Sequence, residues 1–435
     1  MKIALVFCRI DNLFDKCSAG VFSMFESNPP LGLGAIGTAA KRRGHEVKIF
    51  DQLLHDYSND EMIEWIRNFS PDMIGFSCTS LNIENSIICG SSLKEKLNCI
   101  IFAGGIHITL CAEKVMNKQV FDFLISGEGE EVFEAVLNDI ENGVSLDRIL
   151  VKGFIREGVS KDCDCYAAIL KTINQPVIDR GIFEINLYKN KGALLEETPC
   201  YSLFSSRGCP YMCKFCSKPD YFKIYRQRDV EGVIEEIDVL IKEFGAKAIS
   251  FREDNFTVDH KRLRMFCNTM IEKYNGTVFW ECESRADMPT ELLQLMYDAG
   301  CRGIWCGVET IVPKWSEWIN KGLQKENVIK FYDDCKNIGI KTGALFMFGF
   351  PEQTDEEIEE DVNFAISLPT EFSAFQCLAI FPGSPLEEYY KEHEDLKYTV
   401  TEGVSLALTK GFSYQEMIAK ERDINIRIKS NRLAK

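Results

Sequence analysis

Three cysteines that are close together in the sequence, Cys209, Cys213 and Cys216, offer three thiolates to a metal cluster and no fourth. Cysteine thiolates are the usual ligands of iron–sulfur clusters. A cubane cluster that is held by only three of them keeps one iron open to another ligand. Four ligands would suit simple electron transfer, whereas an open iron indicates catalysis.

Two alternatives to a cluster are a zinc site and a chance grouping, because the chain has 18 cysteines and three of them could fall close together by chance. Zinc sites usually pair one CxxC with a second CxxC or with two histidines. No such second pair lies near the triplet. The spacing therefore favours an iron–sulfur cluster.

The stretch from Arg207 to Cys216, which reads RGCPYMCKFC, closely resembles the signature of the radical S-adenosylmethionine (SAM) superfamily, including the aromatic Phe215 before the last cysteine. The resemblance implies a 4Fe-4S cluster whose open iron binds the amino and carboxylate groups of SAM. One electron from the cluster would then break a carbon–sulfur bond and release a 5′-deoxyadenosyl radical.

The composition limits where and on what such a protein acts. At 435 residues, 46% of them hydrophobic, the chain has room for two or three domains. The net charge of −16 argues against nucleic acid and anionic membranes as partners. The apolar run at residues 1–8 is too short for a secretion signal, and no stretch approaches the roughly 20 apolar residues of a membrane span. Together with many cysteines, this predicts a cytoplasmic protein with free thiols, suited to an anaerobic cell.

The elements that must position the chemistry alternate between strands and helices. Residues 1–145 are expected to form a doubly wound parallel sheet of five strands, with a Rossmann-like fold. The expected strands are 2–7, 46–50, 73–77, 99–103 and 123–126, and the expected helices are 33–43, 59–69, 84–96, 112–118 and 131–142.

A literal GxGxxG at Gly32, Gly34 and Gly37, with Asp51 further along, invites a dinucleotide-binding interpretation. That fingerprint works only where the glycines directly follow the first strand, so that the pyrophosphate meets the start of a helix. More than twenty residues separate Phe7 from Gly32. We therefore interpret these glycines mainly as helix-packing positions.

Five short segments resemble, in order, the cobalamin-binding domains that are fused to radical SAM enzymes. They are residues 30–33, 43–47, 71–75, 103–107 and 126–130. Ligands of such sheets bind beyond the carboxyl ends of the strands, where glycines allow close approach and hydroxyls can hydrogen-bond. The predicted cobalamin contacts are Leu31, Ser77, Thr79, Ser80, Gly104, Gly105, His107, Gly127, Glu128 and Gly129.

Many methyl-carrying cobalamin proteins supply a cobalt-binding histidine from a DxHxxG motif. None of the five histidines lies in such a motif, and Asp51 and His55 have the wrong spacing. The radical SAM fusions generally lack this motif as well. The resemblance therefore implies a cobalt with no histidine below it.

Residues 146–198 read irregularly and are predicted to be a linker, in which Cys163 and Cys165 are interpreted as free thiols. Residues 199–385 alternate again and resemble the partial (β/α)6 barrel (a partial TIM barrel) of radical SAM enzymes. The expected strands are 202–205, 248–251, 277–282, 303–308, 342–348 and 374–380, and the expected helices are 230–244, 261–274, 290–299, 327–338 and 355–367. Residues 386–435 are expected to be a charged, helical segment.

Barrel chemistry collects at the carboxyl ends of the strands, which places the cysteine loop at the reactive mouth. SAM presents an ammonium, a carboxylate and a ribose diol, so that carboxylates and an arginine are matched partners. By resemblance to the family, the predicted SAM contacts are Phe215, Glu253, Asp254, Glu283, Ser284, Arg285 and Glu309.

The whole chain resembles a cobalamin-dependent radical SAM enzyme, most often a methyltransferase. The resemblance implies that one SAM methylates cob(I)alamin and a second supplies the radical. The radical would activate an unactivated carbon of a small molecule or peptide, which then collects the methyl group. An electron donor such as flavodoxin or ferredoxin would be a partner. Ring formation or rearrangement without methyl transfer stays open, while a methylthiotransferase or a non-catalytic cobalamin carrier fits the cysteines less well.

Overall fold

The computed structural model describes residues 1–10, 28–157, 168–170, 173–188, 190–218, 220–399, 403–409 and 412–433. The chain forms two compact units. Unit 1 includes the N-terminal strand and Pro29–Tyr188, together with Thr401–Val404, and unit 2 includes Lys189–Val400 and Ser405–Lys435. Cys163 and Cys165 lie outside the described residues. Within the described part, no helix is long and apolar enough to cross a membrane.

Unit 1 contains the predicted doubly wound sheet. Its described strands are ordered β2-β1-β3-β4-β5-β6. They are β1 Lys2–Phe7, β2 Glu46–Asp51, β3 Met73–Ser77, β4 Ile100–Gly104, β5 Phe123–Ile125 and β6 Phe154–Ile155. The first five are parallel, as predicted, and the short β6 adds an antiparallel edge. The strand order reverses between β1 and β3, and in open α/β sheets ligands bind beside such a switch point.

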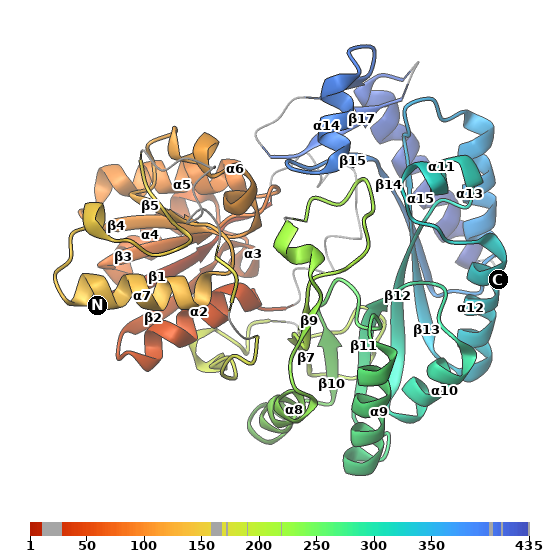
Figure 1. The fold of residues 1–435 in the computed structure, drawn as a ribbon, viewed down its shortest axis with the longest axis horizontal. Helices are drawn as coiled ribbons and strands as arrows, with labels where there is room; N and C mark the ends of the chain where they lie inside the picture. The colour runs from red at the N-terminus through yellow and green to blue at the C-terminus, as the bar shows by residue number, and fades with distance from the viewer. Residues whose placement is uncertain are drawn as a thin grey trace. The chain divides into compact units, whose positions relative to one another are not determined.

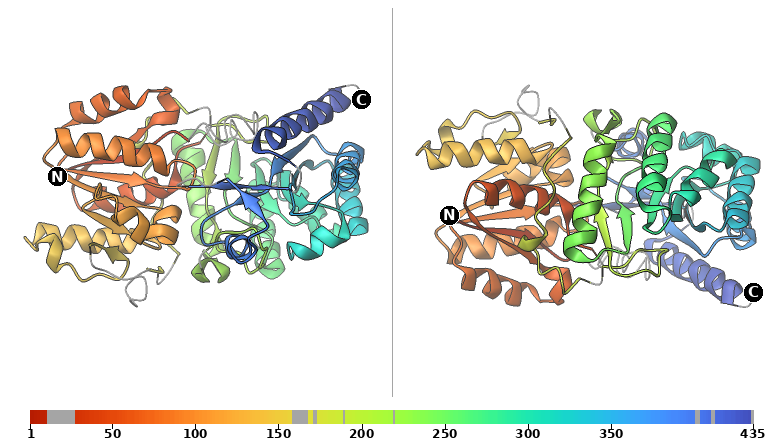
Figure 2. Two further views of the ribbon diagram at one scale, coloured as in Figure 1. Left: turned by 90° about the horizontal axis from the view of Figure 1, so that it is seen from above. Right: turned by 90° about the horizontal axis from the view of Figure 1, so that it is seen from below.

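Helices cover both faces of this sheet (Figures 1 and 2). Two of them, α2 Leu31–Arg42 and α7 Gly129–Glu141, bury Leu33, Ala40 and Phe133 in one apolar cluster. The opposite cluster is completed by α4 Asn59–Phe69, α5 Ile83–Lys96 and α6 Ile106–Met116. Because both faces are buried, strands β1, β3 and β4 are almost continuously apolar, as is typical of a parallel sheet.

The GxGxxG glycines lie inside α2, and the second and third of them, Gly34 and Gly37, serve packing. A Cβ on Gly34 would lie 2.7 Å from Ile178 and 2.8 Å from Phe183, and one on Gly37 would lie 2.7 Å from Ile182. Residues 173–188, predicted as part of a linker, therefore pack on unit 1. Tyr188 also donates a hydrogen bond to Asp51 at 2.9 Å, which occupies the carboxylate that a dinucleotide ribose would need.

Unit 2 contains the predicted barrel-like sheet, ordered β14-β13-β12-β11-β10-β7 and parallel throughout its described strands. These are β7 Cys200–Leu203, β10 Ala248–Phe251, β11 Phe279–Ser284, β12 Cys301–Glu309, β13 Lys341–Phe348 and β14 Phe372–Cys377. The helices between them are α8 Val230–Phe244, α9 His260–Tyr274, α10 Thr290–Asp298, α11 Pro313–Trp318, α12 Lys325–Ile338 and α13 Asp355–Ser367. Of these, α11 was not predicted.

The segment after the barrel is less helical than predicted. It has α14 Pro385–Glu392 and the long α15 Tyr414–Leu433, but also a small sheet of β15 Ala379–Ile380, β16 Lys397–Tyr398 and β17 Ser405–Leu408. Helix α15 runs along β14, the edge strand of the barrel sheet. The side-chain amide of Asn425 accepts a hydrogen bond from the backbone N–H of Phe375 and donates one to the carbonyl of Phe375, both at 2.9 Å.

Candidate active site

The cysteine loop follows β7 and the short strand β8 Ser206–Arg207, which pairs with β9 Arg226–Gln227. Gly208 begins the loop at a φ of 89°, and a Cβ there would lie 2.3 Å from the carbonyl oxygen of Ile224. Only glycine tolerates both the left-handed backbone and this close approach. Cys209 then donates its backbone N–H to the carbonyl of Phe222 at 2.8 Å.

The second half of the loop is bonded to residues that are distant in sequence. The backbone N–H of Lys214 donates to the carbonyl of Ile319 at 2.9 Å, and the Asn320 amide donates to the carbonyl of Met212 at 2.9 Å. The carbonyl of Lys214 accepts from Leu386 at 3.0 Å. Phe215 packs against an apolar cluster that includes Trp315 and Phe350. Hydrogen bonds to the backbone of the loop thus hold its shape without using the cysteine thiols.

The three thiols of the loop are partly exposed. Burial raises the pKa of Cys213 and Cys216, and the neighbouring ammonium groups of Lys321 and Lys218 oppose this rise. Among the described residues, no three His, Cys, Asp or Glu side chains gather tightly enough for a single metal ion. A cubane cluster is larger than one ion and takes each thiolate on a different iron, so that its ligands need not converge on one point. The donor set, three thiols of one fixed loop with cations beside two of them, fits a negatively charged cluster.

Glu253, predicted to bind the SAM amino group, is buried, and both carboxylate oxygens accept hydrogen bonds from the strand end before the loop. The donors are the Ser205 backbone N–H and the Ser206 hydroxyl. Arg262 bonds the same segment at the Ser205 carbonyl, 3.1 Å away. The geometry gives Glu253 a positioning role, and its predicted contact with SAM stays a prediction.

Two further carboxylates have different surroundings: Asp254 follows β10, and Glu283 lies near the end of β11. Asp254 pairs with Lys218 at 2.9 Å, next to Cys216. Glu283 keeps access to solvent. Even so, loss of hydration and the negative charge of Asp254 raise the pKa of Glu283 to about 7. The hydroxyl of Ser284 lies 2.7 Å from that of Thr257, which holds it within the protein.

Arg285 and Glu309 join the cysteine loop to the ends of β11 and β12. The Arg285 guanidinium lies over the ring of Tyr211, 4.3 Å from its centroid, and donates to the carbonyl of Lys321 at 3.0 Å. Glu309 pairs with the Lys321 ammonium at 3.0 Å. Glu309 has a φ of 69°, a conformation that side-chain-bearing residues rarely adopt and that collects at functional sites.

Comparison with protein families supports the assignment of the cysteine loop to a radical SAM cluster. The model of the radical SAM superfamily matches residues 203–365, and that of the B12 binding domain matches residues 20–137. The chain belongs to the cobalamin-dependent radical SAM enzymes. The cofactors of this radical SAM enzyme are therefore a 4Fe-4S cluster, SAM and cobalamin.

Relatives share much of the length of this radical SAM enzyme. An uncharacterized methyltransferase of Pyrococcus horikoshii is 29% identical over 83% of this chain and 78% of its own. The anaerobic magnesium-protoporphyrin IX monomethyl ester cyclase of Rubrivivax gelatinosus is 27% identical over 78% of this chain and 62% of its own. The fold resembles that of TsrM, a radical SAM methyltransferase from Kitasatospora setae, with a TM-score of 0.77 and 15% identity over 99% of this chain and 88% of TsrM.

The residues predicted to contact cobalamin lie at the carboxyl ends of β3, β4 and β5 and at the start of α2, but their glycines serve the protein's own packing. A Cβ on Gly105 would lie 2.5 Å from the carbonyl oxygen of Cys78, and one on Gly127 would lie 2.1 Å from that of Ala168. A Cβ on Gly129 would meet Ile36 at 2.9 Å, whereas Gly104 has more room. Close contacts within the chain therefore account for Gly105, Gly127 and Gly129, and the predicted contact of these glycines with a corrin stays a prediction.

Polar groups at the same edge are largely engaged within the chain. His107 is 1% exposed and lies 2.9 Å from the Ser80 hydroxyl, so it is oriented into the protein. Thr79 donates its backbone N–H to the side chain of Asn82, and the carboxylate of Glu128 accepts from the Leu170 backbone at 2.7 Å. The Thr79 hydroxyl donates to Asn82 and accepts from the backbone N–H of Leu81, both at 3.3 Å, so the partly exposed Ser77 hydroxyl fits a polar cofactor tail better.

Sequence reasoning missed two residues that organise the site. Lys321 lies between α11 and α12, more than a hundred positions from the cysteines, and pairs with Glu309. Asn82 is fully buried and fixes the loop after β3 through Thr79 and Ser77. The sequence did contain a sign of Lys321. It lies in a polar turn, Asn320-Lys321-Gly322, that follows an apolar stretch.

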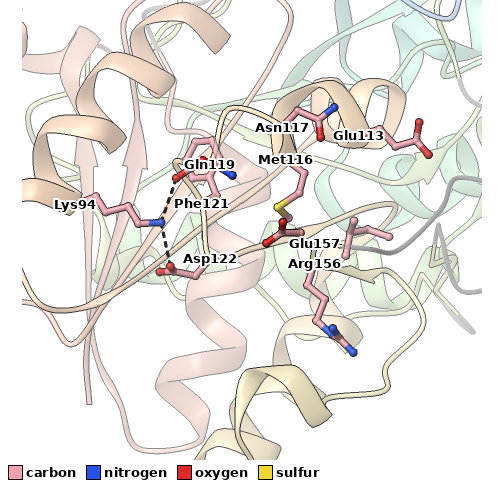
Figure 3. Close-up of a pocket in the computed structure, with 10 residues that line it drawn as sticks. Lys94, Glu113, Met116, Asn117, Gln119, Phe121, Asp122, Arg156 and Glu157 are labelled. Atoms are coloured by element: carbon pink, nitrogen blue, oxygen red, sulfur yellow. Dashed lines mark hydrogen bonds and ion pairs between the residues drawn. The ribbon is translucent and has the colours of Figure 1, made fainter.

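Unit 1 also contains a pocket of about 590 Å³. It is separate from the sheet edge at which the predicted cobalamin contacts lie. Its lining includes Lys94, Gln119 and Asp122, and Lys94 donates to the Gln119 carbonyl and the Asp122 carboxylate at 3.2 Å each (Figure 3). Asp122 directly precedes β5, so this pocket lies at the amino ends of the parallel strands. The predicted cobalamin contacts follow the carboxyl ends, at the opposite edge of the sheet.

Proposed function

We propose that this radical SAM enzyme methylates an unactivated carbon of a small molecule or peptide. The observation that carries the proposal is the combination of a three-cysteine loop at the carboxyl ends of a parallel barrel with a B12-binding domain in one chain. Cobalamin supplies methyl-transfer chemistry when bound. The methyltransferase names of the Pyrococcus relative and of TsrM point the same way.

The chain's own residues would bind and orient SAM through charge. Arg285 and Lys321 offer donors to a carboxylate, and Glu283 offers an acceptor to the ammonium group. With its pKa raised to about 7, Glu283 is only partly ionised near neutral pH. A bound ammonium group would lower that pKa and draw the carboxyl into its charged form.

Ring formation without methyl transfer is the second candidate. It is favoured by the Rubrivivax cyclase, which is 27% identical to this chain and has a different reaction in its name. Both reactions would begin with the same cleavage of SAM. They differ in whether a methyl group leaves SAM as well.

The deciding experiment is anaerobic reconstitution with iron, sulfide and cobalamin, then incubation with SAM and a chemical reductant such as dithionite, followed by analysis of the products of SAM. We expect both 5′-deoxyadenosine and S-adenosylhomocysteine. Deoxyadenosine without S-adenosylhomocysteine would refute methyl transfer and favour cyclisation or rearrangement.

Cys213→Ala should lose cluster absorbance and SAM cleavage by more than a hundredfold, because the cluster would keep only two cysteine ligands. Cys111→Ala is the matched control, since it removes a partly exposed thiol of unit 1. If Cys213→Ala kept its cluster and its cleavage activity, the assignment of the loop would be wrong.

We further propose that the enzyme acts in the cytoplasm and receives electrons from a flavodoxin or ferredoxin. Every cysteine in the described part of the chain is a free thiol, which suits a reducing compartment. Reduction of the reconstituted cluster by purified flavodoxin, followed at the cluster absorbance, would test the donor.

A further inference from the structure

Two lysine–carboxylate pairs flank the cysteine loop, one beside each of its last two cysteines. Lys218 pairs with Asp254 near Cys216, and Lys321 pairs with Glu309 near Cys213. The second pair is the more buried, with side chains 12% and 11% exposed, against 22% and 36% for the first. A buried charge is poorly screened, so Lys321 is the stronger electrostatic neighbour of the loop.

Hydrogen bonds made by the residues before Lys321, and by its own carbonyl, hold it beside Cys213. The two residues before it bond the two residues on either side of the cysteine: Ile319 accepts from Lys214, and Asn320 donates to Met212. Its own carbonyl accepts from Arg285 at 3.0 Å. The lysine is thus held on both sides along its backbone.

The side chain of Lys321 is held in its charged form. Burial disfavours the ammonium, but the ion pair with the Glu309 carboxylate at 3.0 Å favours it. Glu309 makes this contact from a left-handed backbone conformation at the end of β12, with a φ of 69°. The unusual conformation places a carboxylate where it fixes the cation.

A cluster with three thiolate ligands is negatively charged, and it gains one further negative charge when an external one-electron donor reduces it. A fixed cation nearby stabilises the reduced state more than the oxidised state, because attraction grows with the charge. Net charge in the surroundings is one of the factors that set cluster potentials. We propose that Lys321, positioned by Glu309, raises the reduction potential of the cluster. This inference rests on the cluster assigned to the cysteine loop.

The test is a redox titration of the reconstituted cluster without SAM, followed by electron paramagnetic resonance. In Lys321→Met the cation is lost while the Glu309 charge stays, so the midpoint potential should become more negative. We expect on the order of a tenfold lower ratio of reduced to oxidised cluster at a fixed potential, which for one electron is about 59 mV. In Glu309→Gln the amide oxygen can still accept from the Lys321 ammonium at the same place, so the cation stays while the anion is lost, and the shift should be positive.

The double variant Lys321→Met/Glu309→Gln should lie between Lys321→Met and the wild type, because Lys321 acts on Cys213 more strongly than Glu309 does. Lys273→Met is the control, since Lys273 pairs with Asp238 on the outer helices at 2.7 Å. It should leave the potential unchanged. A purely structural ion pair would not give opposite shifts for its two partners.

Equal or same-direction shifts in the two single variants would overturn the inference, even with the cluster fully loaded. If Lys321→Met fails to load a cluster, Glu309→Gln decides alone, and an unchanged potential there overturns the inference. Wild-type protein that takes up no cluster would instead refute the assignment of the cysteine loop itself. Iron and sulfide analysis of each variant separates these outcomes.

Discussion

Glu421, on α15, shows what a single buried carboxyl does to this protein. One oxygen accepts the backbone N–H of Cys377 at 2.8 Å, and the other has no hydrogen-bond partner in the described part of the chain. Burial raises the pKa of Glu421 to about 7, since the charged form loses its hydration. The neutral carboxyl is therefore the form that the folded state prefers.

Glu421→Gln should stabilise the protein at high pH. A carboxyl whose folded pKa is raised contributes stability that is present below the unfolded value near 4.5 and is lost as the pH rises through 7. The glutamine keeps the acceptor for Cys377 and stays neutral. We expect a gain of about 1 kcal/mol at pH 5 and of about 3 kcal/mol at pH 8, at about 1.4 kcal/mol per pKa unit.

Thermal unfolding at pH 5 and pH 8 checks this prediction. Asp423→Asn, an exposed position on the same helix, is the control and should change stability by less than about 0.5 kcal/mol at both pH values. A gain for Glu421→Gln that is no larger at pH 8 than at pH 5 would contradict the assigned cause.

Residue types alone predicted which side chains gather at the mouth of the barrel, but not what each one contacts. Glu253 was expected to face SAM, yet its oxygens bond Ser205 and Ser206. Lys321 was not predicted, because its closeness to Cys213 depends on a turn that returns to the loop from far along the chain. Short-range spacing carries no information about such contacts.

Among the elements, α2 illustrates how one helix can carry a misleading motif. Gly32, Gly34 and Gly37 have different surroundings: nothing lies within 4 Å of a Cβ on Gly32, whereas Gly34 and Gly37 face side chains. The glycines at 34 and 37 are explained by the chain that returns across the helix at residues 178–183. The pattern arises from packing of the chain on itself.

Gly34→Ala should destabilise unit 1 by about 1–3 kcal/mol, because the added methyl meets Ile178 and Phe183 at 2.7 and 2.8 Å. Gly32→Ala, on the same helix, should instead stabilise by about 0.5–1 kcal/mol, since alanine loses less backbone entropy. Urea unfolding of the two variants gives the comparison. A stabilising Gly34→Ala would mean that residues 178–183 do not pack on α2.

Most elements were predicted from the periodicity of apolar residues, and a few were displaced or missed. Strands β1, β3 and β10 and helices α4, α8 and α13 have the predicted bounds. Helix α6 begins at Ile106, six residues before the prediction, because Gly104, Gly105 and His107 were interpreted as contacts in a loop after the strand. The strands β6 and β16 have two residues each, too few for any repeating pattern, and the four-residue β17 was missed as well.

For the whole molecule, the question is where unit 1 ends. A boundary at residue 145 was predicted from the irregular composition that follows. Phe154, Ile182, Phe183 and Tyr188 are nevertheless buried in the apolar cluster under α2 and α7. Burying each such side chain contributes about 1.5–3 kcal/mol, so these four residues help to hold the unit together.

A fragment of residues 1–188 should therefore unfold in one cooperative transition, while a fragment of residues 1–145 should melt at lower temperature and expose apolar surface. Circular dichroism and binding of a hydrophobic dye would show the difference. If the two fragments were equally stable, residues 146–188 would be a linker after all.

The pairing of Asn425 with the edge of β14 has a consequence for solubility. An open barrel sheet has two outer strands, and an uncovered edge is a template for strand addition by another molecule. On β14 the side chain of Asn425 takes the place of a neighbouring strand at Phe375, and Glu421 does the same for Cys377. Helix α15 thus protects the reactive domain against self-association, and a shortened chain would be lost to aggregation before its chemistry could be measured.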